Sequence, residues 1–94
     1  MITVSAKLTF HIAYANSLKE KRMVARSLID KTRRKFNLAI AEVDTQDALR
    51  TLTLGIAVVS GENTHARNMM NEIVLFMENN ADAELMCDER DPIE

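Results

Sequence analysis

Two hydrophobic periodicities alternate along this chain, and their order limits the folds that it can adopt. A period of two residues, which is typical of a strand with one buried face, is clearest where Ile2, Val4 and Ala6 alternate with polar side chains. We predict four strands, at residues 2–13, 38–43, 51–60 and 83–89. A helical period indicates two helices between them, at residues 17–36 and at about 63–79.

The first predicted helix carries its own start signal. Ser17 is followed three positions later by Glu20, which is the spacing of a capping box. On an ideal helical wheel one side of this helix holds Leu18, Val24, Ala25, Leu28, Ile29, Thr32 and Phe36. The second helix has a weaker start signal, and either Ser60 or Asn63 is expected as its N-cap.

The order β-α-β-β-α-β favours a ferredoxin-like α+β sandwich, in which both helices cover one face of a four-stranded antiparallel sheet. Because crossovers between parallel strands are right-handed, the strands at 2–13 and 38–43 should run parallel, with the strand at 51–60 between them. The start of the first helix and the end of the second strand then meet at one edge of the sheet.

Length and composition restrict the class of protein. The 94 residues are expected to form one domain, residues 1–94, and 47% apolar with 28% charged residues is typical of a soluble globular protein. A single cysteine excludes an internal disulfide, which favours a reducing, cytoplasmic setting. The longest apolar run, residues 54–59, is too short to cross a bilayer, so no membrane partner is expected.

Positive charge is concentrated in the first predicted helix. Residues 17–36 carry eight basic and two acidic side chains, whereas the whole chain has a net charge of −2. Four of the cations lie within about 60° of one another on an ideal helix, and with a fifth they form what we call the basic surface: Lys19, Arg22, Arg26, Arg33 and Arg34. Cations at this spacing suit a phosphate backbone, because each can neutralise one charge. The plain alternative is a solvated helix face.

The sheet edge offers a second candidate surface. Residues from the start of the first helix and the end of the second strand should meet there, namely Ser17, Lys21, Glu42, Asp44, Gln46 and Asp47. The helix N-terminus beside Lys21 favours a small anion or a protein partner, unless Glu20 already occupies that helix end. The carboxylates do not have the spacing of a calcium loop, so ion pairs or solvation are expected in place of a metal.

No pattern predicts a catalytic site, a metal or a cofactor, and an enzyme is the third hypothesis. The sequence has no glycine-rich phosphate loop, and His11 and His65 fall at opposite ends of the predicted fold. Cys87 shares the inward register of Leu85, so it is expected to be a small core residue and not a nucleophile.

The face of the sheet away from the helices is expected to be apolar. If Leu38 and Ile40 face the helices, then Ala39, Ala41 and Val43 face outwards; the opposite register would bury the alanines. Small apolar side chains on an open face favour a homo-oligomer that pairs two sheets. The third strand has no aromatic residue, so this face is not a base-stacking platform.

Four segments resemble the YlxP-like bacterial proteins, a small family of unknown function. They are SLKEKR and RSLIDKTRRKFN in the first helix, AEVD-x-QD after the second strand and LGIAVVS in the third strand, and the resemblance runs over about residues 2–90. It implies the ferredoxin-like fold. Because family members are often encoded beside transcription and translation factors, including a ribosome-binding factor, it also implies a link to ribosome maturation or RNA. Thr45 stands where histidine is usual in the family.

The leading hypothesis is a small non-catalytic protein that binds structured RNA or a ribosomal particle through the basic surface, with little base specificity. The rival hypothesis is a homo-oligomeric module that binds a small anionic ligand or a protein partner at the sheet edge. The surroundings of the basic side chains bear on the choice, because arginines held by neighbouring carboxylates would leave no exposed positive surface.

Overall fold

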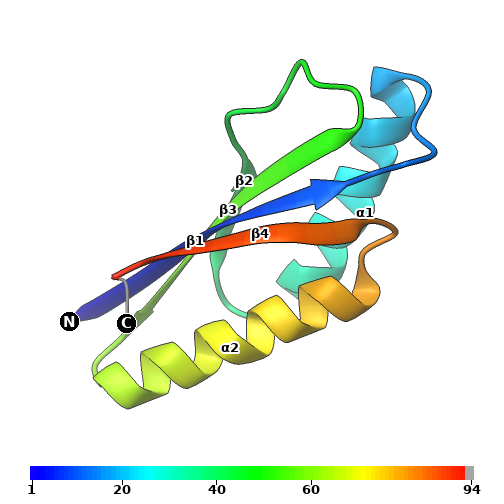
Figure 1. Ribbon diagram of the computed structural model, residues 1–94. Coiled ribbons are helices and arrows are strands. Elements are labelled where there is room, and N and C mark those ends of the chain that lie inside the picture. The colour runs from blue at the N-terminus through cyan, green and yellow to red at the C-terminus, as the bar shows by residue number, and fades with distance from the viewer. Residues whose placement is uncertain (93–94) are drawn as a thin grey trace.

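The computed structural model describes residues 1–92, and it shows the elements in the predicted order (Figure 1). They are β1 (Ile2–His11), α1 (Leu18–Lys35), β2 (Ala39–Glu42), β3 (Thr51–Ser60), α2 (Asn63–Asn80) and β4 (Glu84–Asp91). The strands form one sheet in the order β2-β3-β1-β4, and every neighbouring pair is antiparallel. The ferredoxin-like α+β fold is confirmed, as is the position of β3 between the parallel strands β1 and β2.

The centre of the sheet is the long pairing of β1 with β3. It runs without interruption from Ile2 opposite Ser60 to His11 opposite Thr51. Strict alternation sends every second side chain of both strands to the same face, so the buried side chains form a continuous layer. Leu8, Phe10, Leu52 and Leu54 in that layer are fully buried.

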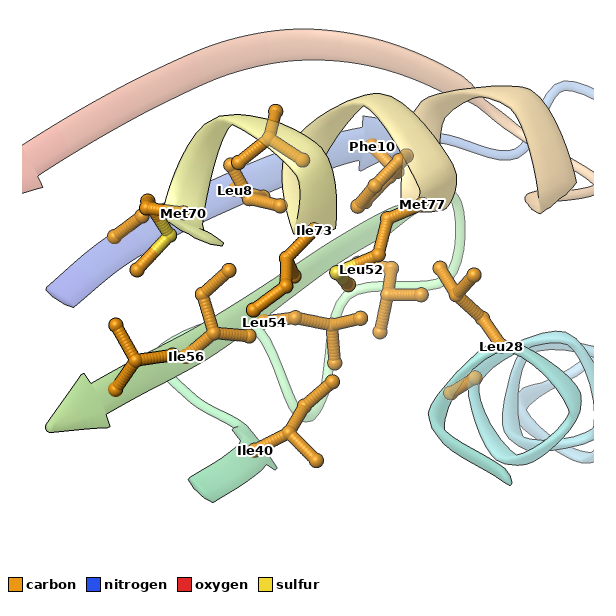
Figure 2. Packing of buried hydrophobic residues seen from close by; sticks show 14 of the residues in the cluster. Leu8, Phe10, Leu28, Ile40, Leu52, Leu54, Ile56, Met70, Ile73 and Met77 are labelled. Carbon is orange, nitrogen blue, oxygen red and sulfur yellow. The ribbon is translucent and has the colours of Figure 1, made fainter. Parts of the chain in front are cut away.

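Both helices cover that one face of the sheet. In Figure 2, Met70, Ile73 and Met77 of α2 and Leu28 of α1 point towards the strand side chains. No helix of residues 1–92 covers the opposite face, and Ala39 and Ala41 of β2 are exposed there while Ile40 is buried. This confirms the strand register in which the alanines face outwards.

The two helices begin in different ways. Ser17 is the N-cap of α1, and its Oγ accepts a hydrogen bond from the Glu20 N–H at 3.1 Å, as the capping-box spacing predicts. The N-cap of α2 is Glu62, whose side chain makes no capping hydrogen bond. The prediction of Ser60 or Asn63 as the cap is therefore wrong. Asn63 is already helical, and Ser60 Oγ instead accepts from the Glu62 N–H at 3.1 Å within the turn.

A β-bulge in β4 moves Cys87 out of the core. Phe10 pairs with Leu85, but the next residue of β1, Thr9, pairs with Cys87, so Met86 is the extra residue. The bulge reverses the alternation from that point on. Leu85 stays half-buried, whereas Cys87 lies on the open face and is exposed. The prediction that Cys87 is a core residue is wrong for this reason.

Candidate nucleic-acid interface

The basic surface lies on the side of α1 that faces away from the core. The buried residues of this helix are Lys21, Val24, Ala25, Leu28 and Thr32. They fix the rotation of the helix about its axis, and all five residues of the basic surface are exposed as a result. An 18-residue helix, anchored along one side, therefore presents its cations to solvent.

The cations of the basic surface have no carboxylate partner in the described part of the chain. The ion pairs of residues 1–92 include Lys7–Asp44, Lys21–Glu42 and Arg90–Asp88. Asp30, which lies on the outer side of α1, is exposed and forms no ion pair within the same residues. The charge of the basic surface is thus not neutralised by neighbouring carboxylates of residues 1–92.

Arg33 has a structural contact in addition to its exposure. Its Nη2 donates a hydrogen bond to the carbonyl oxygen of Ile40 at 3.2 Å. Ile40 belongs to β2, which is an edge strand, so the bond covers a main-chain acceptor that another strand could otherwise pair with. Arg33 therefore joins α1 to β2, and a substitution there would perturb the fold as well as the charge.

Lys21 is buried, which sequence reasoning missed. Its side chain is 1% exposed, and its ammonium donates to the carbonyl oxygens of Thr45 and, at 2.7 Å, Ala48. Its third neighbour is the Glu42 carboxylate, with Nζ 3.0 Å from Oε2. With two donors on main-chain carbonyl oxygens, a carboxylate beside it and almost no exposed surface, the ammonium is not available to a ligand. Lys21 thus lies at the predicted sheet edge, but its role there is structural.

A pattern in the sequence could have found this burial. Lys21 precedes Ala25 by four positions, Leu28 by seven and Thr32 by eleven, which is the spacing of one helix face. The side chain type argued against burial, because lysine is almost never fully buried unless it is paired. Glu42 supplies that pairing, and its Oε2 is itself buried and accepts no hydrogen bond from residues 1–92, so the contact is an ion pair only.

The remaining residues of the predicted edge also serve the fold. The Ser17 hydroxyl caps α1, and Asp44 pairs with Lys7 at 2.7 Å. Asp44 adopts a left-handed conformation with φ of 62°, which aspartate tolerates better than most residues. Gln46 and Asp47 form the exposed turn that follows. Lys21 and Glu42 therefore join the start of α1 to the end of β2, whereas Gln46 and Asp47 lie in an exposed turn.

Thr45 is part of the same loop. Its Oγ1 accepts a hydrogen bond from the Thr53 N–H at 2.9 Å, and its N–H donates to the Val43 carbonyl at 2.6 Å. Its carbonyl accepts from Lys21. Each of these three polar groups of Thr45 thus has a partner within the fold.

The open face of the sheet holds a shallow hollow of about 700 Å³. Its floor is made of small residues of β2 and β3, Ala39, Ala41, Gly55 and Ala57. Charged side chains from the neighbouring strand and loop line it too, among them Lys7 and Asp44, and the hydrogen bond to Asp44 raises the pKa of Lys7. The hollow is therefore apolar at its floor and charged at one side.

Two further observations on residues 1–92 concern metal ions and membranes. No group of three or more histidine, cysteine, aspartate or glutamate side chains in these residues is placed to hold a metal ion. Among the described helices, neither is long and apolar enough to cross a membrane.

Comparison with known proteins agrees with the fold and names a family. A de novo designed protein with a ferredoxin fold, LFR1 1, superposes with a TM-score of 0.63 over 99% of this chain and 88% of its own, at 18% identity. The uncharacterized protein YlxP of Bacillus subtilis (strain 168) is 33% identical over 64 residues, which are 68% of this chain and 70% of the relative. The family model of a protein of unknown function, DUF503, matches residues 3–90. This chain is accordingly a member of the DUF503 family, to which no function has been assigned.

Proposed function

We propose that this protein is a non-catalytic binding protein that holds structured RNA, free or in a ribosomal particle, through the basic surface. The observation that supports the proposal is the exposure of five cations on one side of α1 without a carboxylate partner in residues 1–92. Each cation can neutralise one phosphate and release a counterion. We place this binding in the cytoplasm, because the single cysteine excludes an internal disulfide.

The acidic residues outside α1 limit where RNA can bind. The whole chain has a net charge of −2 although α1 is strongly basic, so other surfaces repel phosphate. Binding should therefore be confined to one side of α1, and it should weaken steeply with salt. The open face of the sheet carries Lys7 beside the carboxylates of Asp44 and Glu89, so it has no excess of positive charge with which to bind RNA.

The test is RNA binding by a charge-reversal variant. Arg22→Glu with Arg26→Glu places two negative charges in the middle of the basic surface, and both positions are exposed, so the fold should persist. We expect the affinity for a fluorescently labelled structured RNA, measured by anisotropy at about 50 mM salt, to fall more than about tenfold. Unchanged affinity in this variant would overturn the proposal.

A matched control comes from the other flank of the same helix. Lys31 is exposed, lies five positions after Arg26, and forms no ion pair within residues 1–92. Lys31→Glu changes the net charge by the same amount as Arg26→Glu but leaves the basic surface intact. Arg26→Glu should weaken RNA binding severalfold more than Lys31→Glu. Equal effects would mean that net charge, and not this surface, governs binding.

We also propose that two copies of the chain associate through the open sheet face. The specific observation in favour is the hollow, whose floor of alanine and glycine lets a second sheet approach to about 10 Å. The same face carries both signs of charge, because Lys7 lies between Asp44 and Glu89. In a two-fold arrangement, Lys7 of each copy can pair with a carboxylate of the other copy. The two basic surfaces would then lie on opposite sides of the dimer and stay exposed.

Light scattering tests this association. A dimer predicts a mass of twice the 10.6 kDa of one chain, and Ala41→Glu, which places a charge on the floor, should return the mass to that of one chain. A wild-type mass of one chain at every concentration would contradict it.

A further inference from the structure

We infer that the basic surface takes double-helical RNA in preference to single strands. This inference rests on the proposed function and specifies its ligand. Three features of the structure lead to it: where the aromatic rings lie, how the helix that carries the cations is anchored, and where the hollow lies.

Aromatic rings are absent from the basic surface. Single-stranded RNA is held mainly by bases that stack on exposed aromatic rings, and this chain has only one tyrosine and three phenylalanines. Phe10 is fully buried. Phe36 and Phe76 pack edge to face with their centroids 5.5 Å apart, and the Lys35 ammonium lies over both rings. The surface thus offers a ligand charge and hydrogen-bond donors but no stacking platform.

Tyr14, which carries the remaining aromatic ring, forms a hydrogen bond with Asp82. Its hydroxyl donates a hydrogen bond to Asp82 Oδ2 at 2.6 Å, which ties the loop before α1 to the loop before β4. A base that stacked on this ring would lie beside the Asp82 carboxylate, which repels phosphate. Tyr14 therefore does not extend the basic surface into a site for single strands.

The cations are carried by one anchored helix. Lys19 and Arg33 are separated by about 21 Å along the axis at the rise of an α-helix, and the opposite side of α1 is anchored by Leu28 and Lys21, each 1% exposed. Cations placed along an anchored helix suit phosphates that are already held in place, as in a duplex. A flexible single strand would lose conformational freedom when it is held against the same row, and this loss weakens binding.

The hollow does not continue the basic surface. Single-strand binders usually track the backbone through a positively charged groove, but the hollow of this protein lies on the face of the sheet away from α1. Its charges are mixed, because Lys7 and Arg90 line it together with Asp44, Glu89 and Asp91. A strand could not continue from α1 into that hollow. A duplex needs only one face of a protein, and it can lie along α1 without approaching the sheet.

A comparison of double-stranded and single-stranded ligands tests the inference. Anisotropy at about 50 mM salt would compare an RNA duplex of about 16 base pairs, each of its strands alone, and the DNA duplex of the same sequence. We expect the RNA duplex to bind at least tenfold more tightly than either strand and at least as tightly as the DNA duplex. With at most five phosphate contacts, the slope of log K against log salt should be no steeper than about −4.5.

Distinct outcomes separate this inference from the proposed function. A single strand that binds as tightly as the duplex would overturn the inference and leave RNA binding by the basic surface in place. A DNA duplex that binds more tightly than the RNA duplex would overturn the assignment to RNA. If no RNA binds, both proposals fail. Arg22→Glu with Arg26→Glu must weaken duplex binding by at least tenfold, and Lys31→Glu must leave it within about twofold, with helical circular dichroism retained in each variant.

Discussion

The Lys21 ammonium lies 3.0 Å from the Glu42 carboxylate, and this pair joins the first turn of α1 to the end of β2. The lysine side chain is 1% exposed and that of the glutamate 22%. Because Lys21 also donates to Ala48 at 2.7 Å, a single side chain holds a helix, a strand end and the following loop together. In Figure 1, the start of α1 and the loop between β2 and β3 lie at the same end of the sheet.

Replacing Lys21 should destabilise the protein strongly. Lys21→Met keeps most of the packed side chain but leaves Glu42 without its counter-charge and leaves two carbonyl oxygens without a donor. Breaking a buried ion pair from one side costs about 3–5 kcal/mol, and the partial exposure of Glu42 favours the lower end of that range. Urea unfolding followed by circular dichroism measures the change.

Lys19→Met is the matched control for this change. Lys19 lies on the same turn of α1 but is exposed, so its replacement should alter the free energy of unfolding by less than about 0.5 kcal/mol. A Lys21→Met variant that unfolds at the same urea concentration as the Lys19→Met variant would contradict the structural role of Lys21.

The sequence patterns predicted most of the fold because they record alternation and capping directly. The bounds of β3 agree with the prediction, since Leu52, Leu54 and Ile56 alternate without a break. Ser17 marked the start of α1 in the same direct way. The strand order followed from handedness alone, which does not depend on side-chain detail.

The errors arose where a tertiary contact overrides a local pattern. Lys21 is buried because Glu42 and two carbonyl groups meet it, and none of these lies near it in the sequence. Cys87 is exposed because a bulge opposite Thr9 reverses the alternation of β4, and the bulge has no marker in the residues of β4 itself. The composition of α1 predicted a basic surface. Whether carboxylates from other elements pair with its cations depends on the tertiary structure, so the sequence could not predict it.

The exposure of Cys87 predicts how its thiol reacts. A thiol reagent should modify Cys87 in the native protein without denaturant. The reaction should be slow near neutral pH, because the hydrogen bond from the thiol to Glu89 raises the pKa of Cys87 and disfavours the reactive thiolate. Glu89→Gln should increase the rate severalfold at constant pH. If labelling occurs only after unfolding in the Ala41→Glu variant as well as in the wild type, the bulge is wrongly placed.

Gly55 offers a stabilising substitution on the open face. It lies in the middle of β3 with no positive φ, and an added Cβ would meet Val43 Cγ1 at 3.4 Å, an ordinary contact. Glycine inside a strand costs about 0.5–1 kcal/mol relative to alanine, so Gly55→Ala should raise the free energy of unfolding by about 0.5 kcal/mol. RNA affinity should not change, because Gly55 is on the face opposite α1. A lower urea midpoint would show that Val43 cannot accommodate the methyl group.

Deprotonation of the Tyr14 hydroxyl should lower the stability of the protein at high pH. The hydrogen bond to Asp82 raises the pKa of Tyr14 from 10.0 to about 12 in the folded state, because the protonated phenol is the donor. The contribution of this bond is therefore fully present below pH 10.0 and is lost as the pH rises through about 12.

Since the chain has one tyrosine and no tryptophan, ultraviolet absorbance of the tyrosinate reports Tyr14 alone. Asp82→Asn should return the absorbance midpoint towards 10.0, and Tyr14→Phe should remove the corresponding loss of stability. A wild-type midpoint at 10.0 would show that the two loops are not tied through this bond.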